Sequence, residues 1–315
     1  MAASEKEKQN GKTLSLIAGT TICNAHCPFC ISKMTPFQGM TPKLEKINEE
    51  KLDSAFLLAK KAGLGTVLIT SKGEPTLYPE HISTYLAYAK KHEFSRVELQ
   101  TNAILFGTHP EKYDALLAQW KEQGLNLVAI SIVHYLPEKN QAVYTRDKPY
   151  FDLPSVISHL HSEGFKVRLA CVLLKGYVDN VAEMKKMMEF AAKHKVDQLT
   201  LRRMEAVDDS EDPLMAAWTR HRVLPKETMD EFAGELSKNG KQIGGFFYGA
   251  KLYEYGKGKQ NVCLTTGLTD KVITEGEIRQ LIYFPSGRII TDWRYDTAKG
   301  EQELLQIALP EKEGV

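Results

Sequence analysis

Three cysteines near the start of the chain form the segment whose residue types most clearly suggest chemistry. They are Cys23, Cys27 and Cys30, three of the five cysteines in the 315-residue sequence, and their spacing is C-x3-C-x2-C. Thiolates this close together bind soft metals or an iron–sulfur cluster. Because an ordinary [4Fe–4S] centre takes four cysteines, three thiolates would leave one iron with an open coordination position. The spacing therefore predicts an iron–sulfur centre that can bind a further molecule.

Two other uses of these cysteines fit the sequence less well. An odd number of clustered cysteines in a long chain is unusual for a disulfide framework. A structural zinc site usually takes four ligands; His26 is a candidate fourth, but it lies inside the same segment without a second half-site. A non-catalytic iron–sulfur or zinc-binding protein stays an alternative hypothesis.

The segment Cys23-Asn-Ala-His-Cys27-Pro-Phe29-Cys30 closely resembles the cluster motif of the radical S-adenosylmethionine (radical SAM) enzymes, including the aromatic residue before the last cysteine. The resemblance implies a [4Fe–4S] cluster on the three cysteines, with Phe29 in the part of the loop that binds S-adenosylmethionine (SAM). In that family the open iron chelates SAM, and reductive cleavage yields methionine and a 5′-deoxyadenosyl radical. An electron donor such as flavodoxin or ferredoxin is implied as well.

The sequence Lys72-Gly73-Glu74-Pro75 resembles a second element of the family, Gly-Gly-Glu-Pro, with Lys72 in place of the first glycine. It follows a predicted buried strand. A sharp turn there presents carbonyl and carboxylate oxygens, which suit an ammonium group such as that of SAM, and glycine permits close approach. We therefore expect Gly73, Glu74 and Pro75 to contact the cofactor.

Residues at the ends of later predicted strands complete the resemblance. Thr101 and Asn102 match the start of the family's Thr-Asn-Gly, and Ser131 stands where related enzymes place a hydroxyl group for SAM. Segments around 172–180 and 201–205 are similar to the GTP-cyclizing molybdopterin enzymes of the same superfamily. On that match Arg202, together with Arg168, is expected to face the SAM carboxylate, because a guanidinium group binds a carboxylate through two hydrogen bonds.

Apolar strand-like runs and helical periodicity alternate about six times between residues 13 and 209, which predicts parallel βαβ units. Six units are too few for a closed eight-fold barrel. We therefore predict an α/β fold, a partial (β/α)6 TIM-like barrel, which is also the architecture that the resemblance implies. Residues 1–12 read as a disordered leader. Residues 210–315 are predicted to form an extension, with helices and a β-hairpin at 281–293, that closes the barrel and shapes the substrate pocket.

Composition excludes several classes of function. The net charge of +1 gives no signal for a nucleic-acid partner. No apolar run approaches the roughly 18 residues that a membrane span needs, and the polar start of the chain lacks a signal core. These features predict a cytoplasmic protein without a membrane partner.

Only Cys171 and Cys263 lie outside the cysteine motif. One cysteine in the last third cannot bind an auxiliary cluster, which argues against molybdopterin synthesis but leaves a nucleotide substrate open. Cys171 is expected to be a buried hydrophobic residue. Cys263 is expected on a loop near the pocket, where it is a candidate hydrogen-atom donor in an epimerization, although a structural role is the simpler interpretation.

The main hypothesis is a radical SAM enzyme that abstracts a hydrogen atom from a carbon of a small polar metabolite. Epimerization, dehydrogenation and rearrangement all remain open as outcomes. Modification of a peptide or protein residue is the enzymatic alternative.

Overall fold

The computed structural model describes residues 11–207, 210–246, 249–265, 278–291 and 293, and the structural statements below concern these residues. The predicted leader lies outside them except for residues 11 and 12. The strands are β1 Thr13–Ile17, β2 Thr66–Thr70, β3 Val97–Thr101, β4 Leu127–Ile132, β5 Lys166–Leu173, β6 Gln198–Arg203, β7 Gly240–Gly245, β8 Lys251–Tyr255, β9 Gln260–Thr265, β10 Gln280–Tyr283 and β11 Ile289–Ile290.

Helices follow most of these strands. They are α2 Ile31–Met34, α3 Glu49–Lys61, α4 Pro79–Lys91, α5 Ile104–Thr108, α6 Pro110–Glu122, α7 Pro137–Tyr144, α8 Leu153–Ser162, α9 Val181–Lys193, α10 Pro213–Arg220 and α11 Lys226–Asn239, with a 3-10 turn, η2, at Pro75–Leu77. Several helices begin at a side-chain cap, which satisfies an N–H group that has no partner within the helix. Asn48, Asp152 and Asn180 accept such bonds at the starts of α3, α8 and α9.

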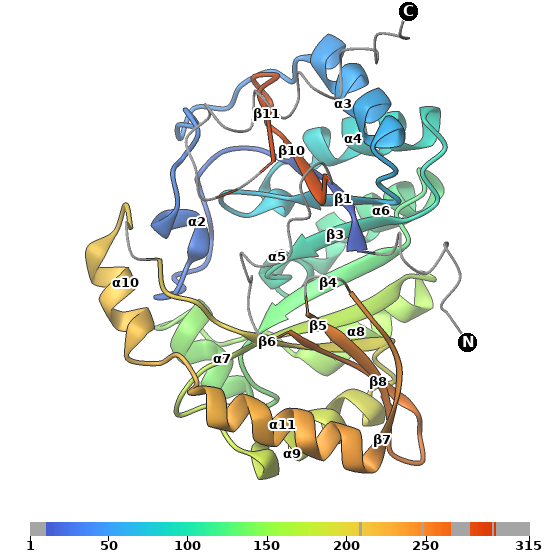
Figure 1. Ribbon diagram of the computed structural model, residues 1–315. Coiled ribbons are helices and arrows are strands. Elements are labelled where there is room, and N and C mark those ends of the chain that lie inside the picture. The colour runs from blue at the N-terminus through green and yellow to red at the C-terminus, as the bar shows by residue number, and fades with distance from the viewer. Residues whose placement is uncertain (1–10, 208–209, 247–248, 266–277, 292, 294–315) are drawn as a thin grey trace, which may run out of the picture.

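An open sheet organises the described part of the chain (Figure 1). Its strand order is β11-β10-β1-β2-β3-β4-β5-β6-β9-β8-β7. Every neighbouring pair from β10 to β9 in this order is parallel, and the pairs beyond them are antiparallel. The predicted partial barrel is confirmed, because the βα units run in the expected order and the sheet does not close.

The last third of the chain adds strands to both edges of this sheet. β9 lies beside β6, with Thr200 opposite Cys263, and β10 lies beside β1, with Leu14 opposite Leu281. The predicted hairpin is present as β10 and β11 around a turn in which Gly287 has φ +93°. A boundary near residue 210 stays a prediction, since strands from both sides of it share one sheet.

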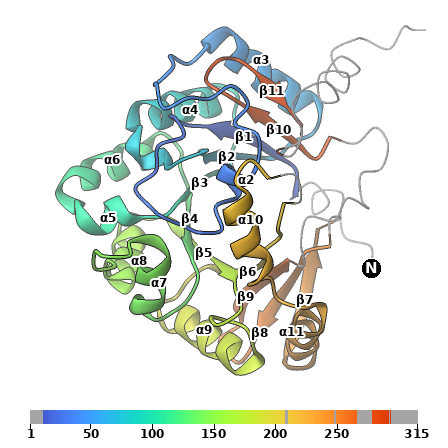
Figure 2. The ribbon, with the colours of Figure 1, turned by 90° about the vertical axis from the view of Figure 1, so that its left-hand side faces the viewer.

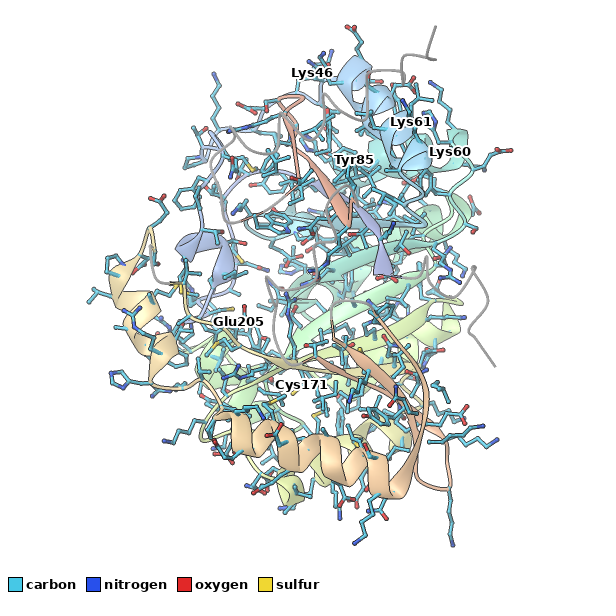
Figure 3. The ribbon with its side chains drawn as sticks, viewed as in Figure 1. Lys46, Lys60, Lys61, Tyr85, Cys171 and Glu205 are labelled. Atoms are coloured by element: carbon cyan, nitrogen blue, oxygen red, sulfur yellow. The ribbon has the colours of Figure 1, made fainter. Side chains whose placement is uncertain are left out.

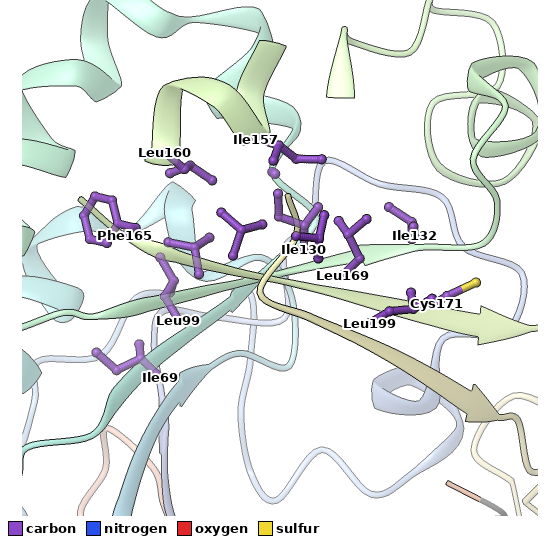
Figure 4. Close-up of a cluster of buried hydrophobic side chains, with 14 of the residues drawn as sticks. Ile69, Leu99, Ile130, Ile132, Ile157, Leu160, Phe165, Leu169, Cys171 and Leu199 are labelled. Atoms are coloured by element: carbon purple, nitrogen blue, oxygen red, sulfur yellow. The ribbon is translucent and has the colours of Figure 1, made fainter. Parts of the chain in front are cut away.

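The two faces of the sheet differ, because side chains alternate along each strand. One face packs against the helices. Figure 4 shows Leu169 and Cys171 of β5 in the same apolar cluster as Ile157 and Leu160 of α8. Cys171 is fully buried there, as expected. We call this the outer face of the sheet.

The opposite face, which we call the inner face, lines the inside of the arc of strands. Figure 2 shows this arc from the side on which α2 and α10 lie. It carries mostly polar and partly exposed side chains, such as Gln100 of β3 and Thr200 of β6. Among the described residues, no helix combines the length and apolar character that a membrane span requires.

Candidate active site

The cysteine motif lies on the loop between β1 and α2, at the edge where the parallel strands end (Figure 2). The loop leaves β1 through Gly19, whose φ is +73°. A Cβ atom at Gly19 would lie 1.8 Å from the ring of Tyr78, so only glycine allows this packing. The Tyr78 hydroxyl lies 2.5 Å from Oγ1 of Thr20, which fixes the start of the loop against η2 and α4.

The three thiols influence one another. Burial raises the pKa of Cys23 to about 11, with further contributions from Glu74 and Cys30. Burial also raises the pKa of Cys27 well above its usual value, and Cys30 and Cys23 raise it further. Cys23, Cys27 and Cys30 therefore lie close enough to change one another's pKa. If all three are ionised, they need positive charge nearby.

The donor set fits a cluster better than a single ion. Within the described part of the chain, no three His, Cys, Asp or Glu side chains form a group ready to hold one metal ion. The ligands of a single zinc converge on one point at about 2.0–2.3 Å. The three thiolates of a [4Fe–4S] cluster each bind a different iron, so they need only surround a shared space. Cluster irons would supply positive charge to all three thiolates, in addition to that of Lys33.

Gly73 seats the second motif against the cysteine loop. A Cβ atom at Gly73 would lie 2.0 Å from the backbone oxygen of Ile22, so a larger residue would push the two loops apart. The N–H group of Glu74 donates to the same oxygen at 3.1 Å. Because Ile22 directly precedes Cys23, the position of Gly73 sets the position of the first cysteine.

The Glu74 carboxylate binds protein donors. Oε1 accepts from the N–H and the hydroxyl of Thr76, at 3.1 and 2.7 Å, and from the Thr101 hydroxyl at 2.5 Å. Oε2 accepts from the N–H of Asn102 at 3.0 Å. Burial raises the Glu74 pKa, and these hydrogen bonds oppose that change. The side chain, 2% exposed, thus holds the ends of β2 and β3 together, and only Oε2 keeps acceptor capacity for a ligand.

Asn102 extends this network to the cysteines. Its Nδ2 donates to Oδ1 of Asn24 at 2.7 Å and approaches the sulfur of Cys23 at 3.8 Å. The next residue, Ala103, has φ +57°, a left-handed conformation that is unfavourable for alanine. This geometry explains why a Thr-Asn-Gly motif has glycine at that place.

Ser131 and Arg202, two of the residues predicted to contact the cofactor, lie on the inner face of the sheet. Hydrogen-bonded strand pairing runs from Ser131 through Ala170 and Thr200 to Cys263, and Arg202 lies further toward the end of β6. Arg203 is on the other face, where its Nε donates to the Leu224 oxygen at 3.1 Å. Of the two adjacent arginines, Arg202 is therefore the one on the same face of the sheet as Ser131.

Arg168 lies apart from this group. It is the third residue of β5, and its two terminal nitrogens donate to the two carboxylate oxygens of Glu98 at 2.8 and 3.0 Å. In the sheet Arg168 is opposite Ala129 of β4 and Glu98 is opposite Leu127, so the guanidinium group reaches Glu98 diagonally across β4. Arg168 therefore binds a carboxylate through two hydrogen bonds, but this carboxylate is the side chain of Glu98 and not that of a cofactor.

Phe29 packs into the protein wall beside the cluster loop. Its ring lies edge-on to Tyr144 of α7 at 6.5 Å and tilted against Trp218 of α10 at 6.1 Å.

The expectation that Cys263 lies on a loop is wrong, because Cys263 is part of strand β9. Burial raises the pKa of its thiol to about 11, with a smaller opposite effect from Arg168.

Two features of the site were missed in the sequence. Residues 137–150 contain α7, and the loop is tied to its end, because the N–H of His26 donates to the Tyr144 oxygen at 3.0 Å. Pro137 at the first helical position is the sequence signal that indicates the start of this helix. The other feature is Lys72, which is buried beside the cysteine loop although the sequence shows it only as a departure from a glycine motif.

Glu205 of the Leu-Arg-Arg-Met-Glu segment lies just past β6, on the side of the sheet where α2 is found (Figure 3). Figure 3 also labels Cys171 of β5 and Tyr85 of α4. The Tyr85 hydroxyl donates to the Ile17 oxygen at 2.7 Å, so α4 supports the end of β1 from which the cysteine loop starts.

An open parallel barrel with three thiols on the loop after its first strand is the architecture of an enzyme that holds an iron–sulfur cluster at the carboxyl edge of its sheet. The profile of the radical SAM superfamily matches residues 17–191, more than half of the chain, and the chain belongs to that superfamily. It is a radical SAM enzyme, whose cofactors are a [4Fe–4S] cluster and SAM.

Two curated relatives share part of the sequence. GTP 3′,8-cyclase of Aquifex aeolicus is 28% identical over 192 residues, 61% of this chain and 56% of the relative. GTP 3′,8-cyclase of Chlorobaculum tepidum is 29% identical over 191 residues, 60% of this chain and 52% of the relative. The chain therefore spans about half the length of the curated relatives it matches.

Solved structures share the fold over a longer range. Streptococcus suis SuiB bound to S-adenosylmethionine aligns with a TM-score of 0.59 at 14% identity, over 98% of this chain and 69% of SuiB. Native anSMEcpe with bound AdoMet and Cp18Cys peptide aligns with a TM-score of 0.55 at 15% identity, over 93% and 80%. At such low identity these similarities concern the fold alone.

Proposed function

We propose that this radical SAM enzyme abstracts a hydrogen atom from a carbon of a small polar metabolite bound against the inner face of the sheet. The polarity of that face is the observation that carries the proposal. Ser131 and Thr200 lie on it partly exposed, and Arg202 at its edge is exposed. Hydroxyl and guanidinium groups bind polar and anionic groups of a ligand, whereas an apolar substrate would displace water from them without replacing its hydrogen bonds.

The cysteines, the Gly73 turn and Arg202 have separate tasks in this proposal. Cys23, Cys27 and Cys30 would hold the cluster. The turn at Gly73 and Glu74, with Thr101 and Asn102, would shape the place of the SAM ammonium group, and Arg202 would take its carboxylate. Reduction and cleavage of SAM at the cluster supply the 5′-deoxyadenosyl radical.

The experiment uses anaerobically reconstituted, dithionite-reduced enzyme with SAM and a panel of deuterated small metabolites. GTP is the first compound to test, because it is the substrate named for the curated relatives. A substrate should accelerate formation of 5′-deoxyadenosine and transfer deuterium into it. A panel in which only peptides do so would replace this proposal by peptide modification.

A flavodoxin or ferredoxin is the proposed reductant, docking where α2 and α10 lie side by side (Figures 1 and 2). Ile31, which directly follows Cys30, is 48% exposed, Phe37 is 37% exposed, and Leu214 of α10 is 85% exposed. An exposed apolar patch this close to a redox centre suits a protein partner. Leu214→Glu should slow cleavage driven by flavodoxin and leave cleavage driven by dithionite unchanged; equal rates with flavodoxin would contradict this docking site.

A further inference from the structure

Lys72 is a buried cation next to the cysteine loop for which the proposed function gives no role. Its residue is 2% exposed, and lysine is seldom buried so completely. The ammonium group donates to Oγ1 of Thr35 at 2.7 Å and lies 5.2 Å from the centroid of the Trp293 ring. Both partners are neutral, so within the described part of the chain no carboxylate offsets this charge.

Thr35 attaches the lysine to the turn that carries the third cysteine. α2 begins directly after Cys30, and Thr35 ends it. The Thr35 hydroxyl donates to the Ile31 oxygen at 2.8 Å, which leaves its lone pairs free to accept from Lys72. The ammonium group is therefore held in a fixed direction relative to Cys30.

Electrostatics agree with this placement. Burial lowers the pKa of Lys72 to about 8, and ionised Cys30 raises it. A burial cost of this kind is offset when a negative group lies nearby. Three thiolates on a [4Fe–4S] cluster provide negative charge, and one further electron increases it.

We propose that Lys72 supplies a fixed positive charge to the cluster on Cys23, Cys27 and Cys30 and thereby raises its reduction potential. A cation stabilises the more negative, reduced cluster more than the oxidised one, and net charge near a cluster is one determinant of its potential. Because the group is buried, water and salt screen this interaction only weakly. Lysine in place of the usual glycine thus has a role in electron entry, and Lys72 is a positioning residue that acts through the cluster.

The test measures the midpoint potential of the reconstituted cluster by spectroelectrochemical titration, with the electron paramagnetic resonance signal of the reduced cluster as a second readout. Lys72→Gln keeps a donor for Thr35 and removes the charge, so its potential should be more negative than that of the wild type. Lys72→Arg should keep the wild-type potential. Lys33→Gln is the matched comparison, because Lys33 lies in α2 and is exposed. Its charge lowers the pKa of Cys23 and Cys27, but water screens it, so its loss should shift the potential less than the loss of the Lys72 charge.

An unchanged potential in Lys72→Gln would overturn the proposal, as would an equal shift in Lys33→Gln. Iron content and thermal unfolding of each variant distinguish charge from folding. If Lys72→Gln binds no cluster while Lys72→Arg does, the charge is needed for cluster binding itself, which supports the proposal. If neither variant binds a cluster, the shape of lysine is what matters and the electrostatic role is rejected.

Discussion

The outer and inner faces of the parallel sheet are made of alternate residues of the same strands, yet they have different tasks. On β6, Leu199 and Leu201 are fully buried against the helices, whereas Thr200 and Arg202 face inward and are partly or largely exposed. Burial of the outer residues fixes the direction in which each strand faces, because a one-residue shift would exchange the two faces. The apolar face therefore determines which polar residues reach the site.

The two cysteines outside the motif show the same contrast. Cys171 lies on the outer face among apolar side chains, and burial raises its pKa to about 12. Cys263 lies on the inner face, opposite Thr200. Both thiols stay protonated near neutral pH, but only Cys263 is on the side where a substrate would bind. Matched substitutions on the two faces can separate folding from chemistry.

The largest effect is expected in the cysteine loop. Replacing Cys23, Cys27 or Cys30 by Ala should abolish both the absorbance of the cluster and the cleavage of SAM, because each thiolate holds an iron. Cys171→Ala should keep both properties. Iron analysis and quantification of 5′-deoxyadenosine check this, and full cleavage in any of the three loop variants would refute the assignment.

A strong effect on stability is expected from the outer face of β6. Leu201→Ala should lower the free energy of unfolding by about 2–5 kcal/mol, the usual cost of a cavity in a packed core. Thr200→Ala, one residue away on the inner face, should stay within about 0.5 kcal/mol. Denaturant titration measures both values, and similar losses would show that the inner face is packed rather than available to a ligand.

Glu74 is expected to be structural as well as functional. Glu74→Ala leaves buried donors of Thr76, Thr101 and Asn102 without an acceptor, so we expect a loss of about 3 kcal/mol in unfolding free energy. Glu74→Gln keeps an acceptor and should lose less. Thermal or chemical unfolding of the apoprotein is the measurement; unaltered stability in the alanine variant would mean that the carboxylate network does not hold β2 and β3 together.

A smaller effect is expected from the adjacent arginines. Arg202→Ala should weaken SAM binding about tenfold, which corresponds to about 1.4 kcal/mol, because a charged hydrogen bond to the carboxylate is lost. Arg203→Ala should leave SAM affinity unchanged and lower stability slightly, since Arg203 binds the Leu224 oxygen. Calorimetry with SAM distinguishes them, and the reverse result would place the wrong arginine in the site.

The most selective change is expected for Cys263. If the reaction is an epimerization, Cys263→Ala should still form 5′-deoxyadenosine but should fail to return a hydrogen atom to the substrate. Burial keeps the thiol protonated, as a hydrogen donor requires. Turnover in heavy water should place deuterium at the inverted carbon in the wild type. Normal product from Cys263→Ala would make the thiol structural and favour dehydrogenation, rearrangement or peptide modification.

The sequence predicted the βα order, the open barrel and the C-terminal hairpin because those depend on local apolar patterns and turn residues. It did not predict that β9 and β10 join the sheet on opposite edges. β10 is four residues long and pairs with β1 from the far end of the chain, so no local periodicity indicates its partner. Cys263 was predicted to lie on a loop because the partner of β9 is β6, which is likewise distant in the sequence.

Site residues were predictable where a motif fixes the backbone and less so where tertiary contacts decide. Gly73 was selected for close approach, and the structure gives the contact with Ile22 that requires it. Arg168 was selected by its residue type, but its partner Glu98 lies two strands away in the sheet. Lys72 was recognised only as a departure from a motif, because its burial depends on Thr35 and Trp293 at distant positions.

The position of β10 has a consequence for the order in which the chain is made. Leu14 of β1 pairs with Val67 on one side and with Leu281 on the other. Synthesis proceeds from the amino end at about 5–20 residues per second, so β1 remains an unpaired edge on one side until nearly all of the described chain has left the ribosome. Throughout that interval β1, the strand that leads into the cysteine loop, is paired only with β2. β10 then pairs with the free edge of β1, so the loop reaches its final surroundings only after residues 280–283 have emerged.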